Sequence, residues 1–170
     1  MTGSGTSQDA PSPGAGAAEL GQHAFLRGMP DRYVAVLARV CRLTQVPEGY
    51  RFFDEGDSAN HLWLIASGHV ALDVHSPGPS RLIVETLGRG DLLGLSWVVP
   101  PYEWQFGATA VQDTSAFELD AAGVRAACDA DPGLGYELLR RVMSAASSRL
   151  QAARIRMLDL YAASSVRDGP

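Results

Sequence analysis

Long apolar runs, cysteine and positive charge are all scarce in this chain of 170 residues. No apolar run approaches the roughly 20 residues that a membrane-spanning helix needs. The two cysteines, Cys41 and Cys128, form no C-x-x-C pair, and no secretory signal precedes them. This pattern indicates reduced thiols packed as small hydrophobes, and we expect a cytoplasmic protein without a membrane partner.

The charge balance disfavours nucleic acid as a partner. The 19 acidic residues exceed the 14 basic ones, which gives a net charge of -5. Proteins that bind DNA through its phosphates usually carry the opposite balance. The sequence also ends at Pro170, shortly after its last helical pattern, which leaves no space for a helix-turn-helix. We therefore expect no direct DNA binding.

Fingerprints of catalysis are missing as well. There is no P-loop, no dinucleotide-binding motif, and Ser96 in "GLSW" does not form a G-x-S-x-G elbow. His61, His69 and His75 fall on predicted strands without the H-x-H spacing that a cupin metal site uses. We expect no enzyme activity, no catalytic residue, no metal and no cofactor, and a cupin-like metal-dependent enzyme stays open as an alternative.

The composition divides the chain into three parts. Residues 1–21 are rich in Gly, Ser, Pro and Ala with almost no bulky apolar side chain, which predicts a disordered N-terminal tail. Residues 22–162 have the composition of one globular domain. Residues 163–170 are predicted to be a second flexible tail.

Eight short segments with Gly- and Pro-rich punctuation follow a short helical stretch that starts at Pro30 and Asp31. Their number and spacing predict a mainly β fold with flanking helices, an eight-stranded antiparallel β-roll or jelly roll. The predicted strands are residues 42–46, 50–53, 61–66, 69–75, 81–87, 92–96, 104–111 and 115–119.

A short helix over 120–130 and a long one over about 131–162 are predicted after the strands. Apolar positions on the long helix alternate by four and three for three heptads, the pattern of a helix that packs along another helix. We favour a homodimer seam over a helix that lies only on its own barrel. The seam consists of Leu139, Met143, Ala146, Leu150, Ala153, Met157 and Leu160.

The charges that flank this seam all have one sign. Arg140, Arg149, Arg154 and Arg156 would repel their counterparts in a parallel helix pair. We therefore expect these arginines to find acids on the barrel, to extend into water as a solvated helix face, or to meet an acidic partner.

The segment "FFDEGDSANHLWLIASGHVAL", residues 52–72, resembles the β-roll signature of cyclic nucleotide-binding domains, the regulators of the catabolite-activator type. "GRGDLLG" is similar to the turn and strand before that family's phosphate-binding cassette, and "ATAVQDTSAFELD" to the strand pair after it. The resemblance covers roughly residues 23–162. The matching positions are Phe53, Gly56, Ala59, Leu62, Ile65, Gly68 and Val70.

The cassette itself departs from the family. The resemblance implies a Gly-Glu pair that contacts ribose and an Arg that pairs with the cyclic phosphate, but Leu95 follows Gly94 and Trp104 stands at the Arg position. No Arg or Lys lies between Arg89 and Arg125. A buried phosphate without a cation costs several kcal/mol, so we expect weak or no binding of ordinary cyclic AMP or GMP. Pro100 and Pro101 also argue against the family's short cassette helix.

The expected ligand pocket consists of Gly94, Leu95, Ser96, Trp104, Gln105 and Phe106. Its rings have two interpretations, a plug that fills the vacated site as core, which we favour, or an apolar ligand pocket. The resemblance thus implies a non-catalytic regulatory or sensing module that acts through a partner protein or an unidentified small molecule. The alternative is a genuine cyclic nucleotide sensor with an unusual anchor, such as an arginine from the long helix.

Overall fold

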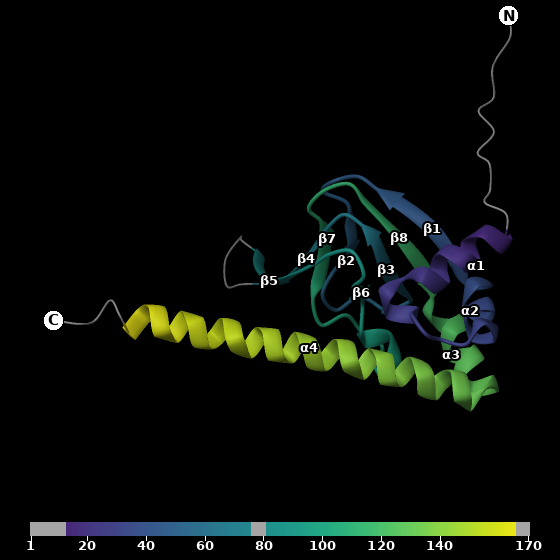
Figure 1. Ribbon diagram of the computed structural model, residues 1–170. Coiled ribbons are helices and arrows are strands. Elements are labelled where there is room, and N and C mark those ends of the chain that lie inside the picture. The colour runs from purple at the N-terminus through teal and green to yellow at the C-terminus, as the bar shows by residue number, and fades with distance from the viewer. Residues whose placement is uncertain (1–12, 76–80, 166–170) are drawn as a thin grey trace, which may run out of the picture.

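The structure is a computed structural model that describes residues 13–75 and 81–165, with side chains described only between Gly16 and Leu158. Three helical segments, α1 (Pro13–Gln22), a 3-10 turn (Ala24–Leu26) and α2 (Asp31–Ala38), precede the strands. α3 (Ala121–Ala130) and the long α4 (Pro132–Ser165) follow them (Figure 1). The strands are β1 (Cys41–Val46), β2 (Arg51–Phe53), β3 (His61–Ser67), β4 (Val70–His75), β5 (Arg81–Leu87), β6 (Leu92–Leu93), β7 (Gly107–Ala110) and β8 (Thr114–Asp120).

Two four-stranded sheets face each other to form the roll. Their orders are β1-β8-β3-β6 and β2-β7-β4-β5, and every pairing is antiparallel. The predicted fold class, an eight-stranded antiparallel β-roll with a long C-terminal helix, is confirmed. Alternating side chains of both sheets, such as Ile65, Val70 and Leu72, fill the space between the sheets.

The N-terminal tail is shorter than the sequence predicted. Helix α1 begins at Pro13, inside the segment expected to be disordered, and Leu20 is fully buried against the core. The small residues of α1 allow close packing, since the side chain of Val34 on α2 comes near Gly21. The helix therefore forms through tertiary contacts rather than through its own apolar content. Residues 1–12, and 166–170 of the predicted second tail, lie outside the described residues.

Two of the predicted strands are shorter than expected where the pocket was predicted. β6 ends at Leu93 because Gly94 turns the chain with a φ of 91°, and a three-residue 3-10 helix at Ser96–Val98 follows. β7 begins only at Gly107, so the segment 104–106 is a loop and not a strand. Both differences arise because the chain leaves the sheets here and crosses the end of the roll.

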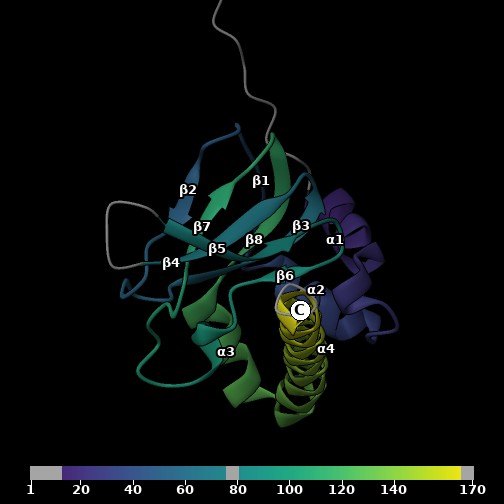
Figure 2. The ribbon, with the colours of Figure 1, turned by 90° about the vertical axis from the view of Figure 1, so that its left-hand side faces the viewer.

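Helix α4 has two halves with different surroundings. Leu134, Leu138 and Val142 are buried against the rest of the domain. From Met143, which is 56% exposed, the helix runs along the end of the roll and then extends past it (Figure 1). Figure 2 looks along α4 and shows the roll on one side of the helix. The second half thus has one side toward the roll and another open to solvent.

Within the described ranges, no helix combines the length and apolar character that crossing a bilayer requires.

Candidate functional site

A cavity of about 360 Å³ lies between the end of the roll and helix α4. All six residues of the predicted pocket line it, and the strands add Phe53, Leu72, Val84 and Glu85. The helix closes the other side with Ala146, Arg149, Leu150, Ala153 and Arg156. The sequence therefore identified the loop side of this cavity, whereas the strand and helix walls come from the tertiary structure.

Trp104 belongs to the core and also forms part of the cavity wall. It is 4% exposed and stacks on Phe53 with 3.9 Å between ring centroids. Its ring reaches Gly94, where an added Cβ would come within 2.7 Å of Trp104 Cη2. Trp104 thus fills the position at which the resemblance places an arginine, while Phe106 is 41% exposed and its ring is accessible.

The cavity contains one acid and two bases. Arg149 and Arg156 line it from α4, and Glu85 lines it from β5. Arg149, with a 17% exposed side chain, donates to the backbone oxygen of Leu92, and its Nε lies 4.0 Å from Glu85 Oε1. Burial lowers the pKa of the Arg149 guanidinium, although Glu85 opposes that effect. One of the flanking arginines therefore does find an acid on the roll, as the sequence led us to expect.

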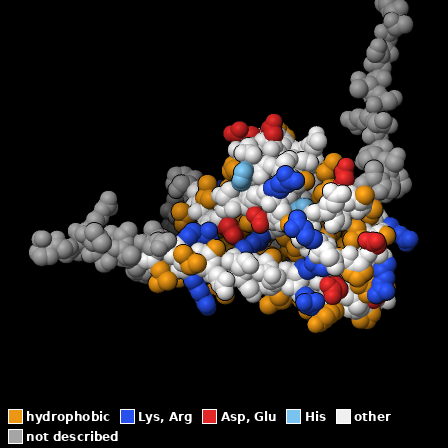
Figure 3. Space-filling view, in the orientation of Figure 1, with side chains coloured by type: hydrophobic (Ala, Val, Ile, Leu, Met, Phe, Trp, Pro, Cys, Tyr) orange, Lys and Arg blue, Asp and Glu red, His pale blue; other side chains and the backbone are white. Residues whose placement is uncertain are grey.

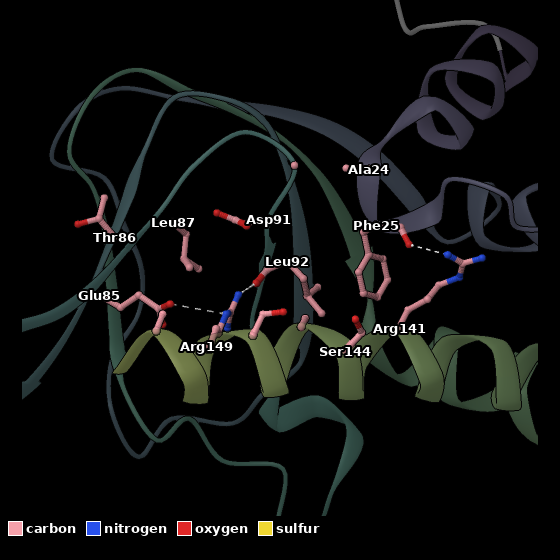
Figure 4. Close-up of a pocket in the computed structure, with 14 residues that line it drawn as sticks. Ala24, Phe25, Glu85, Thr86, Leu87, Asp91, Leu92, Arg141, Ser144 and Arg149 are labelled. Atoms are coloured by element: carbon pink, nitrogen blue, oxygen red, sulfur yellow. Dashed lines mark hydrogen bonds and ion pairs between the residues drawn. The ribbon is translucent and has the colours of Figure 1, made fainter. Parts of the chain in front are cut away.

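A second cavity, of about 460 Å³, lies beside the first one along α4, and Arg149 lines both (Figure 4). Figure 4 shows Arg149 pointing from α4 toward Leu92 and Glu85, and Arg141 reaching the loop at Phe25. Arg141 donates to the backbone oxygens of Phe25 and Arg27. These contacts join α4 to the roll at Arg149 and to the N-terminal segment at Arg141.

The cations of the strands point elsewhere. Arg51 on β2 and Arg81 on β5 both pair with Asp73, which is 5% exposed on the outer side of β4. Arg51 also donates to Thr109 on β7 and to Asp54. Among the described residues, the cavity has no cation from the roll itself, and both of its guanidinium groups belong to α4.

The predicted seam borders this cavity. Ala146, Leu150 and Ala153 belong to both, and Leu150 is 53% exposed. Met143 and Met157 are each 56% exposed and lie outside the cavity wall. Leu139 is 48% exposed and lines a separate pocket together with Trp97. The side chain of Leu160 lies outside the described residues.

The histidines of the strands are separated from one another. His61 lies 3.5 Å from Glu118, whereas His75 lies 3.8 Å from Glu55. In the ranges that the structure describes, no three His, Cys, Asp or Glu side chains gather as metal ligands. Both cysteines are free and partly buried, and burial raises the pKa of Cys41 to about 12. Burial raises the pKa of Cys128 as well, so neither thiol has the lowered pKa of a reactive nucleophile.

The roll, its long C-terminal helix and the cavity between them define a class of regulatory domain. The family model of the cyclic nucleotide-binding domain matches residues 43–131, and the chain belongs to that family. The matched region begins within β1 and ends just after α3, so it contains most of β1, the whole of β2 to β8 and the pocket loop.

One curated relative is distantly similar to this chain. The CRP-like cAMP-activated global transcriptional regulator of Mycobacterium tuberculosis is 23% identical over 121 residues, which are 71% of this chain and 54% of that protein. The chain thus spans about half the length of the curated relative that it matches. At this distance, the activity of the relative is not carried over with the fold.

Solved structures share the fold. A cyclic nucleotide-binding domain from Methylobacillus flagellatus has a TM-score of 0.73 at 20% identity, covering 84% of this chain and 83% of that one. The regulatory subunit of a cAMP-independent protein kinase A from Trypanosoma brucei has a TM-score of 0.64 at 17% identity, covering 78% of this chain and 47% of that one. The fold therefore occurs in proteins described as independent of cyclic AMP.

The site list from the sequence missed the charged part of the cavity. Glu85 carried no motif, and Arg149 and Arg156 were noted as charges that flank the seam, with an arginine of the long helix considered only as an alternative anchor. The heptad pattern could have pointed to them, since Arg149 and Arg156 are seven residues apart and so lie on one side of the helix. The pattern alone does not tell whether that side faces the roll or the solvent.

Proposed function

We propose that this chain is a non-catalytic regulatory module of the cytoplasm, which senses a ligand other than ordinary cyclic AMP or GMP and acts through a partner protein. The observation that carries this proposal is the position of Trp104, whose ring lies against Gly94 at the cassette. The loop side of the cavity offers apolar groups and the neutral polar side chains of Ser96 and Gln105.

The energetics of an anion at the cassette support the proposal. A phosphate placed against Leu95 and Trp104 would lose its hydration without gaining an ion pair, at a cost of several kcal/mol. The guanidinium–phosphate contact that would offset the loss is absent from this side of the cavity. Family membership and loss of the ancestral ligand are therefore compatible.

A second candidate function is a cyclic nucleotide sensor with an unusual anchor, because Arg149 and Arg156 do line the cavity. A nucleotide would then place its phosphate at the helix, away from the cassette. Arg149 is already engaged by Leu92 and faces Glu85, so its charge is partly compensated. We therefore rank this function below the first.

We also propose that the chain forms a homodimer through the seam on α4. Four of its side chains, Leu139, Met143, Leu150 and Met157, are about half exposed or more. In Figure 3, hydrophobic side chains gather along the lower edge of the molecule, where α4 runs, with arginines between them. A second copy packed there would cover Leu150 and the mouth of the cavity, which links ligand binding to assembly.

Two more apolar side chains support a partner protein beyond the second copy. Ile155 is 59% exposed on the side of α4 away from the seam, and Leu158, eight residues after Leu150, is 68% exposed beside the edge of the seam. Exposed apolar groups on a projecting helix are typical of an interaction surface.

Calorimetric titration of the purified protein with cyclic AMP and cyclic GMP tests the ligand part of the proposal. We expect no binding heat at nucleotide concentrations up to about 100 μM, since the cassette has no cation. A family member known to bind cyclic AMP serves as the positive control. Saturable binding near 1 μM would reject the first function, and its loss in Arg149→Gln would establish the second one.

A further inference from the structure

The cavity between α4 and the roll is charged on its helix side and apolar on its roll side. Its cations, Arg149 and Arg156, enter from the helix, whereas Leu72, Leu95 and Trp104 form the side toward the roll. A molecule bound here would direct an apolar part into the roll and an anionic part toward α4. The direction of this polarity follows from the side chains alone.

The charged side chains of the cavity wall indicate the net charge of the ligand. Glu85 contributes one negative charge and the two arginines contribute two positive ones, so the wall carries one net positive charge. Glu85 compensates Arg149 in part, across 4.0 Å, while Arg156 has no ion pair or hydrogen bond within the part of the chain that the structure describes. One anionic group would neutralise the wall, and a second one would be left unpaired.

The volume and the lining of the cavity limit the size and polarity of the uncharged part of the ligand. A volume of about 360 Å³ is near the lower end for small-molecule sites. The exposed ring of Phe106 and the side chains of Leu72 and Val84 offer apolar contact, and few neutral polar groups are available for hydroxyls. A sugar or polyol would lose more hydration here than it could recover.

We propose that this cavity binds a small carboxylic acid with an apolar, preferably aromatic, body, and that Arg156, with Arg149 behind it, holds the carboxylate at the α4 wall. This proposal rests on the proposed function, because it names the class of ligand for the same cavity. A guanidinium pairs well with a planar carboxylate, and a carboxylate near Arg149 also compensates the charge of that largely buried arginine.

The test uses 2-naphthoate as the probe and its uncharged analogue 2-naphthamide as the reference, titrated by calorimetry into the full chain. We expect the acid to bind at least tenfold more tightly than the amide. In Arg156→Gln that preference should fall to within about threefold, because the carboxylate loses the guanidinium group that Arg156 contributes to the cavity wall. Arg154→Gln is the matched control, since Arg154 is exposed on the same helix but does not line the cavity.

Each outcome has a defined meaning. Equal affinity for acid and amide, an undiminished preference in Arg156→Gln, or no binding of 2-naphthoate overturns this proposal and leaves the absence of cyclic nucleotide binding untouched. Competition of 2-naphthoate by cyclic AMP at micromolar concentration rejects the proposed function instead. Val84→Trp, which fills the cavity from a partly exposed position on β5, should abolish binding of the acid while circular dichroism stays that of the parent, and unchanged binding would overturn the proposal.

Discussion

Gly94 and Trp104 depend on each other at the centre of the candidate site. Gly94 has a φ of 91°, a conformation that side chains with a Cβ rarely adopt, and the ring of Trp104 occupies the space beside it. Trp104 has no room to withdraw because it stacks on Phe53. The ring of Trp104 at the centre of the site is therefore part of the packing of the core.

Gly94→Ala should destabilise the protein by about 2–4 kcal/mol, because backbone strain and overpacking act together. Gly56→Ala is the matched control. Gly56 has a similar φ of 87° but open space around it, so its replacement should cost only about 1–2 kcal/mol of strain. Urea unfolding gives both free energies, and equal losses would show that the ring of Trp104 does not confine residue 94.

His23 is the second residue with a distinctive environment. It is 7% exposed, its Nε2 donates to the backbone oxygen of Ile65, and its Nδ1 accepts from the backbone N–H of Phe25. Burial lowers the pKa of His23 below its ordinary 6.5, against the opposing effect of Asp91 and with that of Arg89. The folded state thus favours the neutral imidazole and the unfolded state binds more protons.

The free energy of unfolding should therefore decline as the pH falls below about 6.5 toward the lowered pKa of His23, and should not depend on this group above that range. His23→Gln keeps a donor and an acceptor without a proton to titrate, so its decline between pH 6.5 and 5.5 should be smaller. His75→Gln, whose histidine side chain is 70% exposed, should retain the slope of the parent. Superimposable slopes for parent and His23→Gln would contradict the assignment.

At the scale of the elements, one ion-pair cluster joins four strands. Asp73 on β4 accepts from Arg51 on β2 and from Arg81 on β5, and Arg51 also donates to Thr109 on β7. Hydrogen bonds from Arg51, and then from Arg81, hold the pKa of Asp73 below its ordinary value. Charged and polar side chains thus tie the four strands of this sheet together.

Asp73→Asn should cost about 2–3 kcal/mol, less than a fully buried pair would, because Arg81 is 42% exposed and remains hydrated. The stabilisation by Asp73 is present above its ordinary pKa of 3.8 and is lost as the pH falls through the lowered value in the folded state. Thermal unfolding at pH 7 and pH 3 measures both effects. Asp129 is exposed, so Asp129→Asn is the control and should stay within about 0.5 kcal/mol of the parent. An equally small loss in Asp73→Asn would show that the ion-pair cluster does not stabilise the fold.

At the scale of the whole molecule, α4 serves the core, the cavity and the seam. Its first half is fixed by Leu134, Leu138 and Val142, and Arg149 ties the second half to β6 through Leu92. Any ligand that alters the contacts of Arg149 would shift the balance between arrangements of this helix. The helix is therefore the element through which we expect binding to reach a partner.

Met143→Arg should convert a dimer into a monomer in light scattering, because it places a cation on the seam without touching the cavity wall. Leu150→Arg should do the same but would alter the cavity as well. Gln151→Arg, one residue further along an exposed side of the helix, is the control and should leave the mass unchanged. A parent that is itself a monomer, or a Met143→Arg variant with the dimer's mass, would exclude the seam.

Local chemistry explains why so much of the fold could be read from the sequence. The Gly- and Pro-rich turns between the segments predicted the approximate positions of all eight strands, and Pro30 predicted the start of α2 at Asp31. Both succeeded because turns and helix starts depend on a few adjacent residues. The glycines and apolar positions of residues 52–72, together with the later segments that resemble the cassette region, were enough to recognise the family. Helix α1 escaped prediction because its stability comes from contacts with α2 rather than from its own composition.

The sequence by itself determined the strands, the long helix and the absence of a cation from the pocket loop, because each depends on residue type and spacing along the chain. Only the tertiary structure decided that Trp104 packs under Gly94 and that Arg149 and Arg156 face the cavity. These positions depend on how α4 is rotated against the roll. That rotation is set by contacts between segments far apart in the sequence, which no local pattern encodes.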